Sequence, residues 1–104
     1  MSGHKPPDYT TVSPYLIVDG ASRTIEFLAA VFDAVELRRF PDADGRLMHA
    51  EVRIDDSVVM LADATADWPP VPSYVHVYVP DVDATYRRAL DAGGTTWWIA
   101  TRVD

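Results

Sequence analysis

Cysteine is absent from the 104 residues of this chain. The chain therefore forms no disulfide, and it has neither a thiolate nucleophile nor the cysteine ligands of a zinc site. Long apolar runs are also absent: none approaches the roughly 20 residues that span a bilayer, and the N-terminus lacks the apolar core of a signal peptide. These absences predict a cytoplasmic protein that does not associate with membranes.

Positive charge is scarce, with 9 Lys and Arg against 16 Asp and Glu, which gives a net charge of −7. Binding to nucleic-acid phosphates or to an anionic membrane surface needs clustered Lys and Arg. The sequence also lacks a Gly-x-Ser-x-Gly elbow, a glycine-rich phosphate loop and a His-Glu-x-x-His pair. We therefore expect neither a nucleic-acid partner nor one of these standard catalytic centres.

The feature that is present is an internal repeat. Residues 15–32 (YLIVDGASRTIEFLAAVF) and 77–93 (VYVPDVDATYRRALDAG) both show an apolar strand, an acidic turn and an amphipathic helix. Leu28 and Leu90, which close the two helical patterns, lie 62 positions apart. The first copy is followed by three further strand-like stretches, and the second copy by only one.

Apolar periodicity predicts six strands, at residues 9–18, 35–40, 47–54, 57–62, 74–79 and 95–102. Two helices are expected, at 21–33 after an Asp19 cap and from 82 to about 92 after an Asp81 cap. The helical spacing predicts that the following residues face inward: Ile25, Leu28, Ala29 and Phe32 in the first helix, and Val82, Tyr86, Ala89 and Leu90 in the second.

These elements predict an α+β fold divided into modules. Residues 1–8 read as a flexible tail, 9–66 as a first βαβββ module, 67–73 as a proline-rich linker and 74–104 as a second, incomplete module. At this size the chain is one compact domain or two small interlocked modules.

Alternation along two strands points to a candidate site. Met48, Ala50, Val52 and Ile54 share the face expected to pack on a helix, and the opposite face carries His49, Glu51 and Arg53. In the fifth strand one face carries Tyr74, His76 and Tyr78. These two polar and aromatic faces either line a common cleft or are simply solvated. Glu51 beside His49 is a candidate general base.

Four segments together resemble the vicinal oxygen chelate (VOC) superfamily, the group of glyoxalases, bleomycin-resistance proteins and extradiol dioxygenases. The segments are PYLIVDGASRTIEFLAAVF, DADGRLMHAEVRIDDSVVMLAD, YVHVYVPDVDATYRRAL and GGTTWWIATRV. The chain is most similar to the small bacterial glyoxalase-like branch. The resemblance implies paired βαβββ modules whose curved mixed sheets surround a cavity, often in a homodimer. Unpaired strand edges in the short second module favour a homodimer as well.

The chain departs from this branch after the second helix. Members of the branch place two further strands before the last one, whereas here Leu90 is only five residues from Thr95. Either these strands are deleted, or a segment near residues 90–94 is missing from the sequence; we expect the second. A Cα–Cα distance well beyond ~3.8 Å between Tyr86 and Thr95 would support a missing segment.

The resemblance also bears on metal binding. The resemblance implies that metal-dependent members of the superfamily take their ligands from four positions. These positions match Ser13, Glu51, Tyr74 and Trp98 of this chain, of which only Glu51 is a strong ligand. We therefore expect no metal or other cofactor. A site for Ni, Mn, Zn or Fe formed by Glu51 with His49 or His76 is the alternative.

Two functions follow as hypotheses. The first is a metal-free protein that sequesters a small planar or apolar compound, as bleomycin-resistance members do. The second is a glyoxalase-like lyase or isomerase, or a dioxygenase, that uses Glu51 in a reduced ligand set. The predicted cavity residues are Tyr15, His49, Glu51, Arg53, Tyr74, His76, Tyr78 and Trp98, because aromatic side chains suit planar ligands.

Overall fold

The computed structural model of the protein describes residues 3–73, 75–92 and 98–100. Its elements in chain order are β1 (Tyr15–Val18), α1 (Ala21–Phe32), β2 (Val35–Pro41), β3 (Leu47–Ile54), β4 (Ser57–Asp63), β5 (His76–Tyr78), α2 (Val82–Asp91) and β6 (Trp98–Ala100). No helix among the described residues is long and apolar enough to cross a bilayer.

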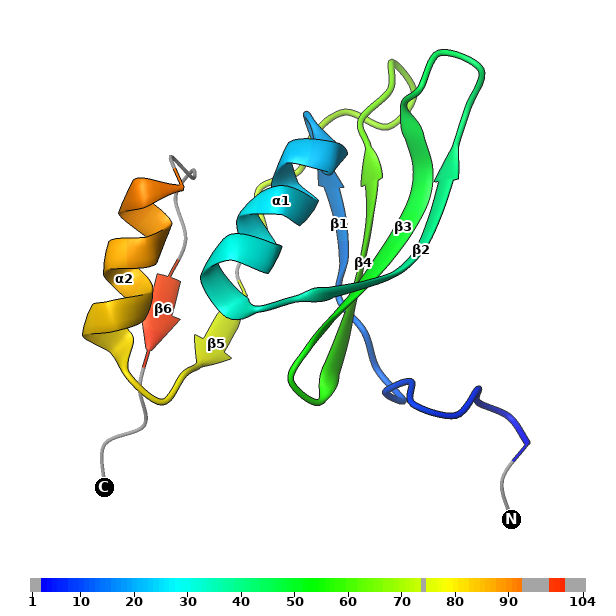
Figure 1. The fold of residues 1–104 in the computed structure, drawn as a ribbon. Coiled ribbons are helices and arrows are strands. Elements are labelled where there is room, and N and C mark those ends of the chain that lie inside the picture. The colour runs from blue at the N-terminus through cyan, green and yellow to red at the C-terminus, as the bar shows by residue number, and fades with distance from the viewer. Residues whose placement is uncertain (1–2, 74, 93–97, 101–104) are drawn as a thin grey trace.

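The first five elements form the predicted βαβββ module. Its sheet has the order β1-β4-β3-β2, in which β1 runs parallel to β4 and the other neighbours are antiparallel. Figure 1 shows α1 lying between this sheet and the second module, while no helix of the described residues covers the opposite face of the sheet. The prediction of an α+β fold with a curved, mixed sheet is therefore confirmed. The four-stranded sheet does not close on itself.

The second module contains only β5, α2 and β6. β6 pairs with β5 in parallel, just as β4 pairs with β1. It is therefore the counterpart of β4, the last strand of the first module. Within the described residues nothing corresponds to β2 and β3, so the second module is truncated. The prediction of a missing segment near residues 90–94 falls partly on residues 93–97, which lie outside the described residues, and it stays a prediction.

The main core lies between α1 and one face of the four-stranded sheet. Fully buried side chains include Leu28 on α1, Val52 on β3 and Leu61 on β4. Ile25 and Phe32 are buried as predicted; the inward position of Ala29 was predicted wrongly, since Ala29 is exposed.

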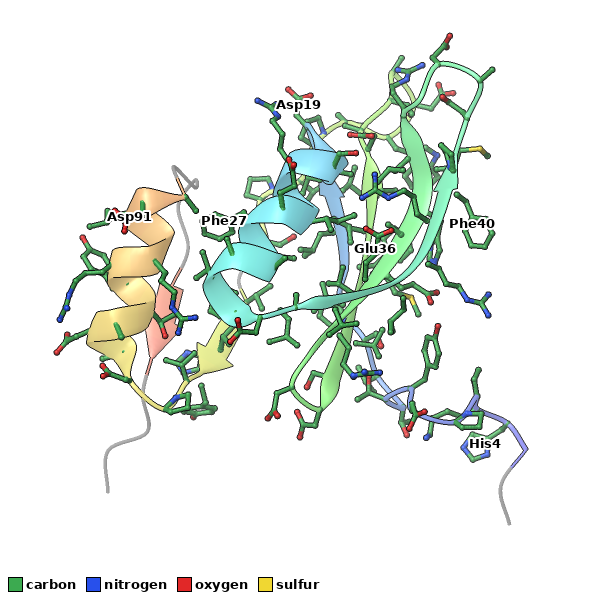
Figure 2. The ribbon with its side chains drawn as sticks, in the orientation of Figure 1. His4, Asp19, Phe27, Glu36, Phe40 and Asp91 are labelled. Carbon is green, nitrogen blue, oxygen red and sulfur yellow. The ribbon has the colours of Figure 1, made fainter. Side chains whose placement is uncertain are left out.

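Two further residues of α1, Phe27 and Val31, are buried although the helical spacing did not predict them to face inward. Figure 2 shows Phe27 on the side of α1 that faces α2, and the two helices pack against each other. A helix covered on two sides buries a wider stripe than one covered on a single side.

The start of α1 is stabilised by a side chain from β4. The prediction that Asp19 caps this helix was wrong: no side chain of the N-cap region forms the bond, and the N-cap residue is Gly20 in the left-handed region at φ 93°. The backbone N–H groups of Gly20 and Ala21 donate instead to Asp63 Oδ1, at 3.1 and 2.7 Å. A residue 42 positions away therefore satisfies donors that the first turn of a helix leaves open.

The first strand begins later than predicted. Residues 9–14 are not part of β1, and this part of the strand prediction was wrong. The segment is held near β4 by two bonds, in which Met60 N donates to the Pro14 carbonyl at 2.9 Å and Val58 N donates to Thr10 Oγ1 at 3.4 Å. Pro14 has no N–H for a regular ladder, which explains why strand pairing starts at Tyr15.

The second helix has the predicted cap but not the predicted face. Asp81 accepts a hydrogen bond from Ala84 N at 3.1 Å, as expected. The inward positions of Tyr86 and Leu90 were predicted wrongly, because these side chains are 57% and 61% exposed, while Thr85 is buried. A two-stranded sheet is too narrow to cover the full apolar stripe of a helix.

Candidate functional site

The face of the sheet opposite α1 carries the candidate site. Strand registers align Tyr15 of β1 with Met60 of β4, Met60 with Glu51 of β3, and Glu51 with Arg38 of β2. This row crosses all four strands, and its side chains lie on the face without a helix. We call this surface the open face. Figure 2 shows Phe40, which pairs with His49, projecting from β2 on the side away from α1.

Alternation along β3 is confirmed at its centre and fails at its start. Ala50 and Val52 are buried under α1, but Met48, predicted on the same face, is 66% exposed. The register between β2 and β3 shifts between Phe40 and Pro41, opposite this end of β3. A bulge of this kind re-aims side chains, so Met48 leaves the α1 face.

Glu51 is the buried acid of the open face, with 7% of its surface exposed. Its Oε1 accepts a hydrogen bond from the Tyr9 hydroxyl at 2.5 Å, and its Oε2 accepts one from His49 Nε2 at 2.8 Å. The Arg38 guanidinium lies 3.8 Å from Oε1. Burial acts to raise the pKa of Glu51, but these donors outweigh burial and leave the pKa below its ordinary value. The carboxylate is therefore ionised at neutral pH.

The hydrogen bond to Glu51 also changes the pKa of Tyr9. Its pKa is raised, chiefly because its hydroxyl donates to Glu51 and would lose that bond on ionisation. The N-terminal segment that carries Tyr9 forms, with Arg38, Glu51 and Met60, a hollow of about 320 Å³ on the open face. Residues of the predicted tail, His4, Lys5 and Pro6, line this hollow too, so the N-terminal segment is part of the candidate site.

His49 links Glu51 to Tyr15. Its second ring nitrogen, Nδ1, lies 3.1 Å from the Tyr15 hydroxyl, and the two ring centroids are 5.6 Å apart. The Phe40 ring lies on His49 with centroids 6.2 Å apart. Tyr15, His49 and Glu51, all predicted as cavity residues, are thus brought together by the fold.

A larger cavity of about 520 Å³ lies beside Tyr15 on the same face. Apolar side chains form most of its wall: Tyr15, Ile17, Leu47, Met48, Ala62 and Trp68. Trp68 comes from the proline-rich linker, so that segment contributes to the site and does not only connect modules. The volume lies within the range of small-molecule pockets.

The carboxylates at the edge of this cavity already accept hydrogen bonds from backbone N–H groups. Asp63 Oδ2 accepts from Leu47 N at 2.8 Å, while its other oxygen caps α1. Asp42 accepts from the backbone N–H groups of Asp44 and Arg46 at 2.8 and 3.0 Å. These carboxylates hold the backbone in place and leave the cavity without an uncommitted acidic group in its described wall.

The structure does not bring the remaining predicted cavity residues to Glu51. His76 and Tyr78 belong to β5, where both are exposed and their rings meet edge to face at 4.8 Å. Tyr78 instead borders a separate hollow with Arg53, near the C-terminal end of α1. Tyr74 and the side chain of Trp98 lie outside what the structure describes.

The described residues do not fit a resident metal ion. Both oxygens of Glu51 already accept hydrogen bonds, and one of the donors is His49, the residue expected to share the metal. His76 belongs to the other sheet. Over residues 3–73 and 75–92, no three His, Asp or Glu side chains are grouped closely enough to hold a metal.

Sequence reasoning missed Tyr9, Arg38, Met48 and Trp68 as site residues. Arg38 had a usable signal, because the strands at 35–40 and 47–54 flank a turn and pair as a hairpin, which places Arg38 opposite Glu51. No sequence signal indicated Tyr9 or Trp68. Their positions depend on how two irregular segments fold back on the sheet.

Among solved structures, the fold resembles the fosfomycin resistance protein FosX from Listeria monocytogenes. The TM-score is 0.63 at 17% identity, over 81% of this chain and 70% of that one. A FosX structure with Mn(II) and 1S,2S-dihydroxypropylphosphonic acid gives a TM-score of 0.64. TioX from Micromonospora sp. ML1 is 27% identical, with a TM-score of 0.57, over 81% of this chain and 71% of that one.

Sequence comparison gives closer relatives without a known function. Uncharacterized proteins of Mycobacterium bovis and Mycobacterium tuberculosis are 43% identical over 98 residues, covering 81% of this chain. The chain spans 62% and 56% of their lengths, less than two thirds of either.

A family model also covers nearly the whole sequence, matching residues 8–103. The chain therefore belongs to the Glyoxalase/Bleomycin resistance protein/Dioxygenase superfamily.

Proposed function

We propose that this protein binds a small planar or apolar molecule on the open face, in a sequestration or resistance role. The observation that carries the proposal is the cavity of about 520 Å³ beside Tyr15, with Met48 and Trp68 in its wall. Aromatic and thioether side chains offer large, polarisable contact surfaces for a flat ligand.

The polar groups of the cavity support an apolar ligand. Asp42 and Asp63 already accept hydrogen bonds from backbone N–H groups. Ligand binding therefore does not have to desolvate a carboxylate without hydrogen-bond partners there. The fold likeness to FosX, a fosfomycin resistance protein, is compatible with a resistance role. At 17% identity the likeness supports a shared fold only, so we do not infer that this chain binds the ligand of FosX.

A compound screen tests this proposal. Naphthalene, quinoline and acridine are suitable planar probes, and binding is followed by ligand-observed NMR and by isothermal titration. We expect Tyr15→Ala and Trp68→Ala each to weaken binding by about tenfold, because each removes an aromatic wall worth roughly 1 kcal/mol or more. Tyr86→Ala is the matched control, since Tyr86 is 57% exposed and lies on α2. Equal affinity in all three variants would remove the cavity from consideration.

The proposal includes a homodimer. The open face exposes Phe40 and Met48, 49% and 66% accessible, on a sheet side that no helix covers. A second copy that covers this face would also allow Arg53, His76 and Tyr78, the other described residues of the predicted cavity, to meet a ligand from the partner chain. Sedimentation velocity at micromolar concentration tests this: we expect a dimer that Phe40→Glu dissociates. A wild-type monomer would contradict it.

A metal-dependent lyase, isomerase or dioxygenase is the second candidate. It is favoured by one observation, the ionised carboxylate of Glu51 on the open face. Elemental analysis after incubation with Ni²⁺, Mn²⁺, Zn²⁺ or Fe²⁺ separates the two functions. Stoichiometric metal that is lost in Glu51→Ala would favour the enzyme. Metal-free protein that binds the planar probes would favour sequestration. The composition predicts that this role is carried out in a bacterial cytoplasm.

A further inference from the structure

Three side chains on the open face stand in the order acid, imidazole, hydroxyl. Glu51 Oε2 lies 2.8 Å from His49 Nε2, and His49 Nδ1 lies 3.1 Å from the Tyr15 hydroxyl. The acid is buried, whereas Tyr15 is 48% exposed and borders the large cavity. An acid that orients an imidazole, which in turn contacts a hydroxyl, is the arrangement that activates a hydroxyl group.

The direction of each hydrogen bond follows from Glu51. An ionised carboxylate only accepts, so the proton between Glu51 and His49 belongs to His49 Nε2. In a neutral imidazole the other nitrogen then has a lone pair, and Nδ1 accepts the proton of the Tyr15 hydroxyl. Tyr9 and Arg38 help to keep Glu51 in its accepting state from the other side.

We propose that Tyr15 is a general base for a small molecule bound in the cavity, with His49 and Glu51 as its positioning residues. The ligand class is a planar ketone or a similar apolar compound with an acidic C–H beside a carbonyl group. This inference rests on the proposed function, because the same cavity must hold the ligand.

The proton balance of the step is complete without a further reactant. The Tyr15 oxygen takes the proton from the ligand carbon while the phenolic proton passes to His49 Nδ1. The C–H electron pair becomes the enolate of the ligand, and His49 becomes an imidazolium beside the Glu51 carboxylate. Return of a proton to the same or a neighbouring carbon restores the enzyme and exchanges or isomerises the ligand.

The chain offers an internal comparison for this tyrosine. Tyr86 is exposed to a similar degree, 57% against 48%, and lies on α2. It has no imidazole contact among the described residues. A tyrosine that is merely solvated should behave like Tyr86, whereas an activated one should react faster.

The first test measures the reactivity of the two phenols with benzenesulfonyl fluoride on the full chain. The phenolic oxygen attacks sulfur, fluoride leaves, and the proton passes to the imidazole. Peptide mapping by mass spectrometry gives a rate for each tyrosine. A positioned base contributes roughly 10²–10⁴-fold, so we expect Tyr15 to react at least about tenfold faster than Tyr86. His49→Gln and Glu51→Gln should remove that advantage and leave the Tyr86 rate unchanged.

Two readouts separate activation from a structural role. In ¹⁵N NMR spectra, His49 should carry its proton on Nε2, and Glu51→Gln should weaken that preference. With 2-indanone in D₂O, the wild type and Tyr86→Phe should speed deuterium exchange beside the carbonyl group, and Tyr15→Phe should not.

The outcomes distinguish the two proposals. Equal rates for Tyr15 and Tyr86, or 2-indanone that occupies the cavity by saturation-transfer NMR and exchanges only at the buffer rate, overturn the general base and leave the binding proposal standing. If no planar probe binds, the binding proposal fails, and this inference fails with it whatever the reactivity of Tyr15.

Discussion

The two modules begin alike and differ in what covers their helices. In the first module α1 packs on a four-stranded sheet and buries six residues. In the second, α2 packs beside two parallel strands, and Thr85 is the only residue of α2 that is buried within the described part of the chain. The comparison shows that a strand-helix repeat sets the start of each module, while the number of strands decides how much of the helix is covered.

The parallel pairs explain how a shortened module keeps its arrangement. In both modules the first and last strands are neighbours, and the helix provides the crossover between parallel strands that such pairing requires. The strands absent from the second module, among the described residues, correspond to β2 and β3 at the far side of the sheet. Among the described residues the second sheet is therefore narrower, but it keeps the parallel pair beside the helix.

The sharpest test of this difference compares the two leucines that close the repeat. Leu28→Ala should lower the free energy of unfolding by about 3 kcal/mol, because Leu28 is fully buried and its loss leaves a cavity. Leu90→Ala should cost about 0.5 kcal/mol or less, since Leu90 is 61% exposed. Urea denaturation of both variants measures the two values. Similar losses would mean that α2 is covered as fully as α1 in solution.

The helix caps form the next comparison. Asp63→Ala should destabilise the protein by about 2 kcal/mol, because it removes the acceptor for Gly20, Ala21 and Leu47. Asp81→Ala should cost about 1 kcal/mol, because that local cap accepts a single bond from Ala84.

Asp19→Ala serves as the control for both caps. Asp19 is exposed and does not cap α1, so its replacement should change stability by less than about 0.5 kcal/mol. A larger effect at Asp19 than at Asp63 would restore the sequence-based assignment of the cap.

The stability contributed by the Asp63 cap should depend on pH. Burial acts to raise the pKa of Asp63, but the backbone donors Ala21, Leu47 and Gly20 outweigh it and lower the pKa. A lowered folded-state pKa stabilises the fold above the unfolded-state pKa, about 4, and this contribution is lost as pH falls through the folded-state value. Glu51 contributes with the same sign. Wild-type stability should therefore fall more steeply below about pH 4 than that of Asp63→Asn, by thermal unfolding across pH. Parallel curves would contradict this.

The smallest expected effect concerns a surface ion pair between the modules. Arg88 of α2 lies 3.7 Å from Asp33 at the end of α1, and both side chains are well exposed. A double-mutant cycle with Arg88→Ala and Asp33→Ala should give a coupling of about 0.5 kcal/mol or less. A coupling several times larger would mean that charge, and not packing at residues such as Phe27, holds the modules together.

Prediction from the sequence succeeded where neighbouring residues carry the information. The bounds of β3 were predicted correctly, and β2 and β4 each end one residue beyond their predicted ends. Predictions failed where a partner was distant: Asp63 caps α1 from 42 positions away, and Tyr9 reaches Glu51 across the same separation. The predicted inward positions of Tyr86 and Leu90 were wrong for a related reason. Their helical periodicity is genuine, but the sheet that would cover them is narrow.

Local sequence patterns were sufficient to indicate the superfamily, the alternation of β3 that places His49 and Glu51 on one face, and a second module with fewer strands than the first. These properties depend on local periodicity and on the order of elements along the chain. Three features of the site follow from the three-dimensional fold: Tyr15 contacts His49, Tyr9 and Arg38 keep Glu51 ionised, and Trp68 joins Met48 in the cavity wall. Those contacts join residues far apart in the chain, and they exist because the strand registers and the path of two irregular segments bring them together.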